Sequence, residues 1–173
     1  MIIDVSQALK EPGKVFPFAL EEEWEDIEFN GDILHFSAPV HAEGDYFCMG
    51  ENIVFQGKMS IQLELQCSRC LQKFSFPFLK DFAEEYSRKQ DEEHSDVYHF
   101  AGDTVVLDEM LQDQLLLNFP LKILCSDTCK GLCPVCGTNL NRESCSCKRE
   151  QEVESRHPFA ALKHLVLDDD KEV

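Results

Sequence analysis

The sequence predicts an α+β protein: an antiparallel β-sheet that could close into a barrel, one or two packing helices, and a C-terminal zinc-ribbon-like segment rich in cysteine. Three observations support this prediction. Residues 53–65 alternate between apolar and polar side chains, residues 107–115 place apolar side chains at helical spacing, and eight of the nine cysteines form close pairs. A period of two is typical of a half-buried strand, and a period near 3.6 is typical of an amphipathic helix.

Alternating side chains predict three strands. In residues 53–65 every odd position is apolar or glycine, so one face of a long strand should be buried, and Gly57 is the expected place of a bend or bulge. Residues 74–78 repeat the alternation with three phenylalanines, and Pro77 indicates a sheet edge or a strand end. Residues 34–40 alternate as well and are expected to form one earlier strand. Such strands favour an antiparallel sheet.

The second half of the chain predicts shorter elements. Residues 97–100 and 104–107 are expected to add short strands. A helix should then begin with Asp108 as its N-cap and end before Pro120, which cannot continue a helix. A last short helix is expected from His157 onward, where proline follows at the first helical position.

Composition divides the chain into three predicted parts. Residues 1–121 form an acidic β-rich domain, residues 122–150 the zinc-ribbon-like segment, and residues 151–173 a short helix with an acidic tail. The first part carries 24 acidic and 8 basic side chains, and the whole chain has a net charge of −17. An acidic body repels nucleic-acid phosphates and attracts basic proteins, although an acidic surface also serves simply to keep a protein soluble.

The protein is expected in the cytoplasm. The first residues contain no basic stretch followed by an apolar one, and no apolar run is long enough to span a membrane. In a reducing compartment, cysteines clustered at short spacings bind metal more often than they form disulfides. The odd number of cysteines also suits a disulfide framework poorly. We therefore expect one or two zinc ions as the cofactor.

Two cysteine pairs are expected to hold one zinc ion. Cys133 and Cys136 lie on a C-x2-C turn followed by Gly137, and such a turn can place two thiolates at two corners of a tetrahedron. Cys145 and Cys147 begin nine residues beyond Cys136 and offer the other two corners. This spacing is typical of a compact zinc ribbon.

The remaining two pairs leave the assignment of ligands open. Cys67 and Cys70 follow the strand of residues 53–65 and should cap a β-hairpin, whereas Cys125 and Cys129 are spaced for one helical turn. We expect these four to form a second zinc site. The rival assignment places Cys125 and Cys129 with a ribbon pair and leaves Cys67 and Cys70 free or redox-active, because spacing does not fix a long-range pairing.

No arrangement of residues in the sequence indicates an enzyme. The six histidines are scattered without an H-E-x-x-H motif, and no glycine-rich phosphate loop is present. Sites built only from cysteine are closed and structural, which argues against zinc-dependent hydrolysis. Thiol-redox chemistry at Cys67 and Cys70 is a weaker alternative, because a redox C-x-x-C pair begins a helix. Cys48 has no neighbouring cysteine and is expected to be a small buried residue.

Sequence-tolerant RNA binding is the alternative function from another class. Four cations lie around the cysteine-rich segment and could contact phosphates: Lys130, Arg142, Lys148 and Arg149. They would face the field of the acidic body, and no aromatic side chain between residues 121 and 153 offers a stacking surface. The same cations are also ordinary solvated residues.

Residues 124–141, read together with Cys145 and Cys147, closely resemble the C-terminal signature of the YceD family. The resemblance includes the turn of residues 67–70 after an alternating strand. Proteins of this family, from bacteria and plastids, are described as large-subunit ribosomal RNA accumulation proteins. Family resemblance implies a role in biogenesis of the large ribosomal subunit that supports 23S rRNA accumulation or processing, with no catalytic residues to carry over.

The resemblance also implies partners. These are a precursor of the large ribosomal subunit, a basic ribosomal protein or ribosomal RNA, with no membrane and no small-molecule substrate. Genes of the family commonly neighbour that of a small, basic ribosomal protein of the large subunit. We expect the acidic body to hold a basic ribosomal protein while the ribbon touches RNA.

Overall fold

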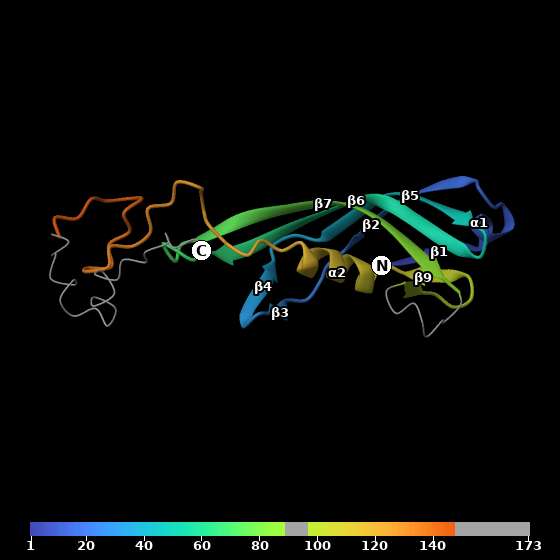
Figure 1. Ribbon diagram of the computed structural model, residues 1–173, viewed down its shortest axis with the longest axis horizontal. Helices are drawn as coiled ribbons and strands as arrows, with labels where there is room; N and C mark the ends of the chain where they lie inside the picture. The colour runs from blue at the N-terminus through green and yellow to red at the C-terminus, as the bar shows by residue number, and fades with distance from the viewer. Residues whose placement is uncertain (89–96, 148–173) are drawn as a thin grey trace, which may run out of the picture. The chain divides into compact units, whose positions relative to one another are not determined.

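A computed structural model of the chain describes residues 1–88 and 97–147 (Figure 1). It contains two compact units, Met1–Cys129 and Lys130–Val173. The boundary expected after residue 121 lies inside the first unit. The expected last helix, from His157, lies outside the described residues.

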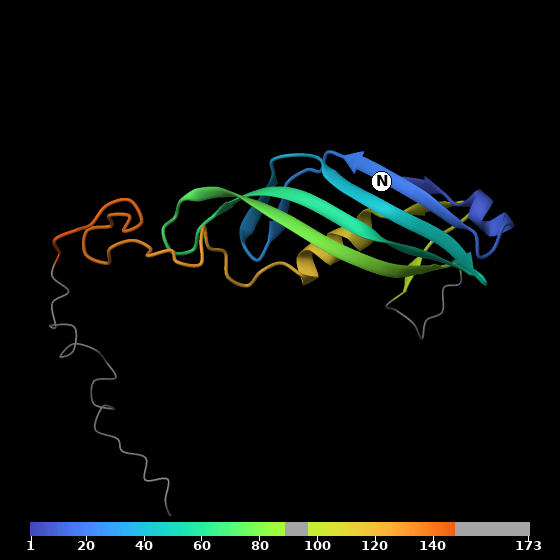
Figure 2. The same cartoon turned by 90° about the horizontal axis from the view of Figure 1, so that it is seen from above.

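The first unit is built on one large sheet whose strands differ in length (Figures 1 and 2). Within the described ranges, seven strands form it: β2 (Val15–Glu22), β3 (Ile27–Phe29), β4 (Asp32–Phe36), β5 (Val40–Met49), β6 (Asn52–Gln66), β7 (Lys73–Ser87) and β8 (Tyr98–His99). All pairs are antiparallel except β7 with β8. A second, two-stranded sheet pairs β1 (Ile2–Asp4) with β9 (Thr104–Val106). The helices are α1 (Ser6–Lys10) and α2 (Asp108–Leu117).

Strand β6 organises the sheet. It pairs with β7 along its whole length, while its other edge pairs first with β5, over Asn52–Ser60, and then with β4, at Leu63 and Glu64. One long strand therefore has two successive neighbours on the same side. The path of strands stays open in the part of the chain that is described. The closure into a barrel that the sequence allowed is not found, because the strands at the two ends of this path, β2 and β3, do not pair with each other.

The core lies between one face of the sheet and α2, which crosses that face (Figure 2). The odd-numbered side chains of β6 are buried there, as its alternation predicts: Ile53, Phe55, Met59, Ile61, Leu63 and Leu65. Helix α2 contributes Met110, Leu111 and Leu115, which are fully buried. Burying a side chain of this size contributes about 1.5–3 kcal/mol, so this layer dominates the stability of the unit.

Several details differ from the sequence prediction. The alternation of residues 34–40 spans two strands, β4 and β5, because the chain bends before Pro39. Gly57 lies in unbroken register with both neighbouring strands, so the expected bulge is absent from β6. Leu107, rather than Asp108, is the N-cap of α2, and Asp108 is the first helical residue. The helix ends before Pro120, as predicted.

Candidate metal centres

The turn between β6 and β7 presents the first pair of cysteines. The backbone N–H of Cys67 donates to the carbonyl of Gln72 at 2.9 Å, and the N–H of Leu71 donates to the carbonyl of Cys67 at 2.9 Å. These bonds close a tight turn over residues 67–72. Both Cys67 and Cys70 are buried. The predicted hairpin with cysteines at its tip is therefore present.

The second pair comes from the segment that follows α2. The backbone N–H of Ser68 donates to the carbonyl of Ile123 at 2.9 Å, which draws this segment alongside the hairpin turn. A side-chain nitrogen of Arg69 donates to the carbonyl of Cys129 at 3.0 Å. Cys125 and Cys129 are thereby held opposite the turn. Sequence reasoning missed Arg69, because only the folded turn brings its side chain to Cys129.

The four sulfur atoms of this first group are arranged as a tetrahedral site requires. Sγ of Cys67 lies 3.7 Å from Sγ of Cys129, and Sγ of Cys70 lies 3.6 Å from Sγ of Cys125. All four lie within 4.8 Å of one another. Four thiolates around a zinc ion, each with a Zn–S bond of about 2.3 Å, are about 3.8 Å apart. The group could therefore hold one metal ion without a large rearrangement.

The protein environment already favours a thiolate in the first group. Burial opposes ionisation of Cys67, but backbone N–H groups at Cys125, Cys70 and Arg69 donate to its sulfur and lower its pKa to about 6. Burial and hydrogen bonds with neighbouring sulfurs raise the pKa of Cys125 to about 12. Donors that stabilise one thiolate also support a metal–thiolate bond. A metal ion would have to displace the proton of Cys125.

The second group lies in the second unit. Cys133, Cys136, Cys145 and Cys147 also place their sulfurs within 4.8 Å of one another. Three backbone bonds shape the first turn: Cys133 N–H to the Thr138 carbonyl at 2.8 Å, Gly137 N–H to the Cys133 carbonyl at 2.9 Å, and Val135 N–H to the Cys133 sulfur at 3.4 Å. Gly137 has φ of 73°, which glycine adopts without strain.

Ionisation in the second group is also asymmetric. A hydrogen bond with the Thr138 hydroxyl is the main cause that lowers the pKa of Cys136 to about 6. The backbone N–H groups of Cys136 and Val135 lower the pKa of Cys133. The hydrogen bond with Cys136 is the main cause that raises the pKa of Cys147 to about 12. Thr138 was not singled out from the sequence, although a hydroxyl after a C-x2-C-G turn is a usable signal.

The structure thus joins Cys67 and Cys70 with Cys125 and Cys129, and it keeps the second group separate. The rival assignment, in which Cys125 and Cys129 join a ribbon pair, is not the arrangement found. Regular strands of a zinc ribbon are missing from residues 130–147, where only one isolated bridge joins Leu132 to Asn139. The fold of this segment is therefore a pair of cysteine turns with a short bridge.

The remaining candidate residues are not part of either cysteine group. Cys48 is buried in the sheet core, as expected. Lys130 and Arg142 are exposed in the second unit. Lys148 and Arg149 lie outside the described residues. No helix among the described residues is long and apolar enough to cross a membrane.

Comparison with known proteins adds the family. The sequence model of the YceD family, described as "Large ribosomal RNA subunit accumulation protein YceD", matches residues 55–166. The chain belongs to the YceD family. This match covers most of β6, all of β7 and α2, and every cysteine of the two groups.

Individual relatives are similar to the chain over different lengths. YlbN of Bacillus subtilis (strain 168) is 29% identical over 164 residues, which cover 92% of this chain and 93% of YlbN. The chloroplastic protein "Large ribosomal RNA subunit accumulation protein YCED homolog 1" is 31% identical over 70 residues in Arabidopsis thaliana and 39% identical over 62 residues in Zea mays. These alignments span 22% and 21% of the two plant proteins. No solved structure matches the chain.

Proposed function

We propose that this YceD-family chain is a non-enzymatic, zinc-binding cytoplasmic factor in biogenesis of the large ribosomal subunit. It would support the accumulation or processing of 23S rRNA by binding a ribosomal protein or a precursor of the subunit. The observation that carries the proposal is the family match over residues 55–166, whose description names large ribosomal RNA accumulation. The two plant relatives carry the same description in their names.

Zinc is the ion that the two cysteine groups suit best. Each group offers four sulfur atoms and no oxygen or nitrogen ligand, which disfavours magnesium and calcium. Tetrahedral sulfur sites in proteins hold zinc or iron, and the C-x2-C turn that each group contains is typical of structural zinc sites. A site with four protein ligands has no open position for water or substrate. This is the physical basis for proposing that the protein is not an enzyme.

Charge supports a basic protein as the direct partner. Residues 1–121 carry 24 acidic and only 8 basic side chains. Such a surface attracts a basic ribosomal protein over several ångströms and repels RNA phosphates. A second candidate, RNA contact by the second unit, is favoured by exposed Lys130 and Arg142 beside the second cysteine group.

Sedimentation of the tagged protein from a bacterial lysate through a sucrose gradient tests this proposal. Co-migration with precursors of the large subunit, lost in a variant lacking the first cysteine pair, is the expected result. Repeating the gradient at moderate salt measures how electrostatic the contact is. Residence only at the top of the gradient, in growing and in stressed cells, would overturn the ribosomal role.

A further inference from the structure

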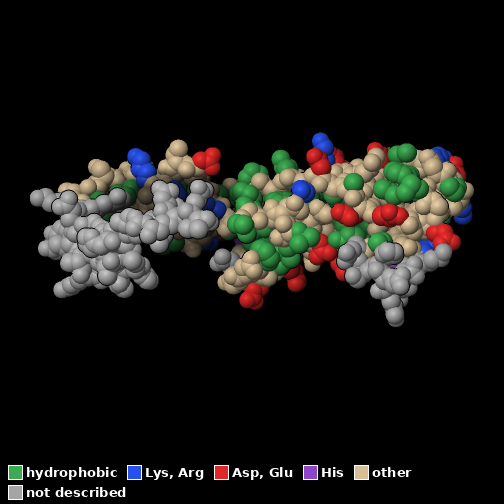
Figure 3. Space-filling view, viewed as in Figure 1, with side chains coloured by type: hydrophobic (Ala, Val, Ile, Leu, Met, Phe, Trp, Pro, Cys, Tyr) green, Lys and Arg blue, Asp and Glu red, His purple; other side chains and the backbone are tan. Residues whose placement is uncertain are grey.

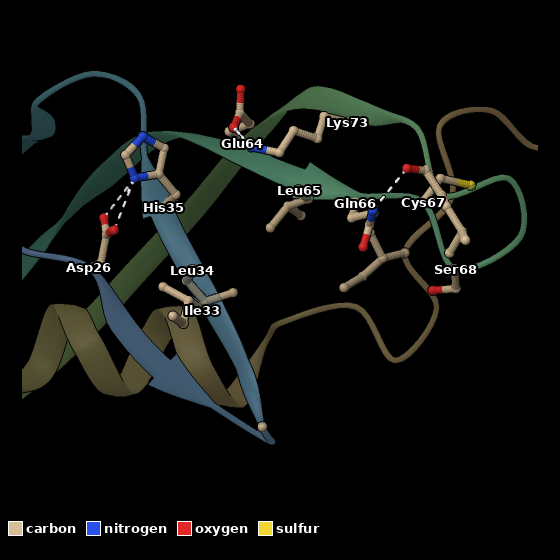
Figure 4. A pocket seen from close by; sticks show the side chains of 13 residues that line it. Asp26, Ile33, Leu34, His35, Glu64, Leu65, Gln66, Cys67, Ser68 and Lys73 are labelled. Atoms are coloured by element: carbon tan, nitrogen blue, oxygen red, sulfur yellow. Dashed lines mark hydrogen bonds and ion pairs between the residues drawn. The ribbon is translucent and has the colours of Figure 1, made fainter.

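A groove of about 660 Å³ lies beside the first cysteine group (Figure 4). It opens where β4 parts from β6. Residues His35 and Phe36 pair with β6, but the preceding residues of β4 pair only with β3. Strand β6 meanwhile continues to Gln66 and enters the cysteine turn. The gap between the β3–β4 hairpin and the turn is therefore bordered by sheet on one side and by the metal-binding turn on the other.

Leu71, in the turn, has a backbone conformation that leucine rarely adopts. Its φ is 57°, in the left-handed region, and the residue is 56% exposed where it lines the groove. The equivalent position of the second C-x2-C turn, directly after its second cysteine, is Gly137 with φ of 73°. A non-glycine residue in this region costs about 1 kcal/mol or more. Leucine at this place therefore destabilises the turn relative to glycine.

Contacts in the folded chain keep Leu71 in this conformation but do not bury it. The side-chain amide of Gln66 donates to the Leu71 carbonyl at 2.9 Å (Figure 4), and the Leu71 N–H donates to Cys67. Both bonds use the backbone, so glycine would make them equally well. The exposed leucine side chain thus has no structural role that accounts for the strain, which points to a role in binding.

Further apolar side chains line the same groove. Ile33 of β4 is 67% exposed, and the half-buried Ile123 and the buried Leu65 also line the groove. Figure 3 shows apolar side chains gathered around β4 and the neighbouring end of the sheet, with acidic side chains beside them. An exposed apolar cluster with a polar rim is typical of a protein interaction site.

The rim of the groove carries more negative than positive charge. Asp26 and Glu64 line it, and Glu28 lies directly across from Ile33 in the β3–β4 pair. Lys73 binds Glu64 at 2.7 Å, and Nδ1 of His35 forms a hydrogen bond with Asp26 at 2.9 Å. Three carboxylates, those of Asp26, Glu28 and Glu64, therefore face one lysine and one histidine. These carboxylates repel phosphates, so binding of a nucleic-acid strand is disfavoured.

We propose that this groove binds an extended segment of a basic protein, which places an aliphatic side chain between Ile33 and Leu71 and its cations beside Asp26 and Glu28. The inference deepens the proposed function, on which it rests for the source of the segment. An extended segment fits because the groove lies between a hairpin and a strand end rather than in a closed cavity.

Fluorescence anisotropy of the full-length, zinc-loaded protein tests this site directly. The probe is a labelled peptide in which single leucines are separated by lysine and serine, and a peptide with serine in place of leucine is its control. Leu71→Gly removes the side chain and relieves the backbone, so we expect about tenfold weaker binding with an unchanged or higher Tm. Leu79→Ala, at an exposed leucine outside the groove lining, should leave the affinity unchanged.

A matched pair of charge reversals separates the groove from the general acidity of the chain. Glu28→Lys lies across from the groove residue Ile33 in the β3–β4 pair, and Glu21→Lys, which makes the same change in net charge, lies at an exposed position of β2. Only Glu28→Lys should weaken binding severalfold. Equal binding by wild type and Leu71→Gly would overturn the proposal. It would also be overturned by Leu71-dependent self-association, or by an RNA oligonucleotide that displaces the peptide.

The groove and the ribosomal role can fail separately. Peptide binding that depends on Leu71, without co-sedimentation of the protein with large-subunit precursors, would support the groove and refute the ribosomal source of the segment. If Leu71→Gly still co-sediments with large-subunit precursors and binds the peptide as tightly as wild type, the groove proposal alone is refuted.

Discussion

Gly44 of β5 and Gly57 of β6 lie directly opposite each other, and neither strand has room for a side chain at that point. A Cβ on Gly57 would lie 3.0 Å from the Cα of Gly44 and closer still to the carbonyl oxygen of Glu43. Phe18 and Phe82 continue the same row on the adjacent strands. The two glycines allow the backbones of β5 and β6 to approach each other closely at this point of the sheet.

Replacing either glycine should therefore destabilise the sheet. Gly44→Ala forces the Cβ against the backbone of β6, and backbone cannot move aside as a flexible side chain can. We expect the free energy of unfolding to fall by about 2 kcal/mol or more, measured by urea denaturation. Ser60→Ala, in β6 but away from this row, should change it by less than about 0.5 kcal/mol. Equal stability of the two variants would contradict the close approach.

The two cysteine groups should bind metal independently. Wild-type protein purified with zinc should contain two ions per chain by elemental analysis. Cys129→Ser should lose one ion and lower the Tm of the first unit, because its group joins the hairpin turn to the segment after α2. Cys136→Ser should also lose one ion but leave the unfolding of the first unit unchanged.

Cys48→Ala provides the control for cysteine loss, because Cys48 is buried away from both groups and should retain both ions. Two ions in Cys129→Ser would show that Cys129 is not a ligand. Loss of both ions from Cys136→Ser would show that the groups are not independent.

Metal binding should weaken as the pH falls. Cys125 and Cys147, with pKa values raised to about 12, are protonated in the metal-free protein at pH 8, and each must lose its proton to become a ligand. Every proton displaced lowers the apparent affinity about tenfold per pH unit. We expect at least this loss between pH 8 and pH 7, measured by competition with a chelator. Proton release on adding zinc to weakly buffered protein provides the second measurement, and its absence would contradict the assignment.

The three tyrosines of the chain should resist ionisation in the folded state. Burial is the main cause that raises the pKa of Tyr46, Tyr86 and Tyr98, and a hydrogen bond to Asp113 at 2.9 Å adds to it for Tyr98. Their folded pKa values exceed the ordinary value of 10.0, so this contribution to stability is complete below pH 10 and declines above it.

Ultraviolet titration of tyrosinate measures this effect. We expect few of the tyrosines to be ionised at pH 10 in the native protein and about half in denaturant. Tyr98→Phe should lower the free energy of unfolding by about 1 kcal/mol at neutral pH and reduce the alkaline loss of stability. Native and denatured titration curves that coincide would contradict the burial of these side chains.

The sequence predicted correctly those strands in which every inward side chain is apolar or glycine and most outward ones are polar. Strand β6 is such a case, because its odd positions face the core without interruption. Strand β7 extends to Ser87, well beyond the predicted 74–78. The prediction stopped short because polar residues also face inward in the second half of this strand. Lys80 binds Asn118 at 2.6 Å and Glu84 accepts a bond from Gln114 at 2.7 Å, so α2 satisfies them. Alternation in hydropathy is lost where a helix supplies polar partners.

The strands of the first fifty residues were harder to predict. Strand β5 turns Ala42, Gly44 and Cys48 toward the core, and such small side chains give a weak alternation. In β2 the inward residues Phe16, Phe18 and Leu20 do alternate, so that strand was within reach of the same reasoning. The groups of cysteines could be recognised from spacing, but their pairing depends on how α2 returns the chain to the hairpin.

A metal ion at the first cysteine group would act as a cross-link across a long stretch of chain. It joins Cys70 to Cys125 and Cys67 to Cys129, positions 55 and 62 residues apart. A covalent bond closing a loop of this length would remove about 4 kcal/mol of conformational entropy from the unfolded chain. During synthesis, the hairpin turn leaves the ribosome long before its two partner cysteines. The ion can be enclosed only when residue 129 has emerged, so metal capture marks a late step in the maturation of the newly made chain.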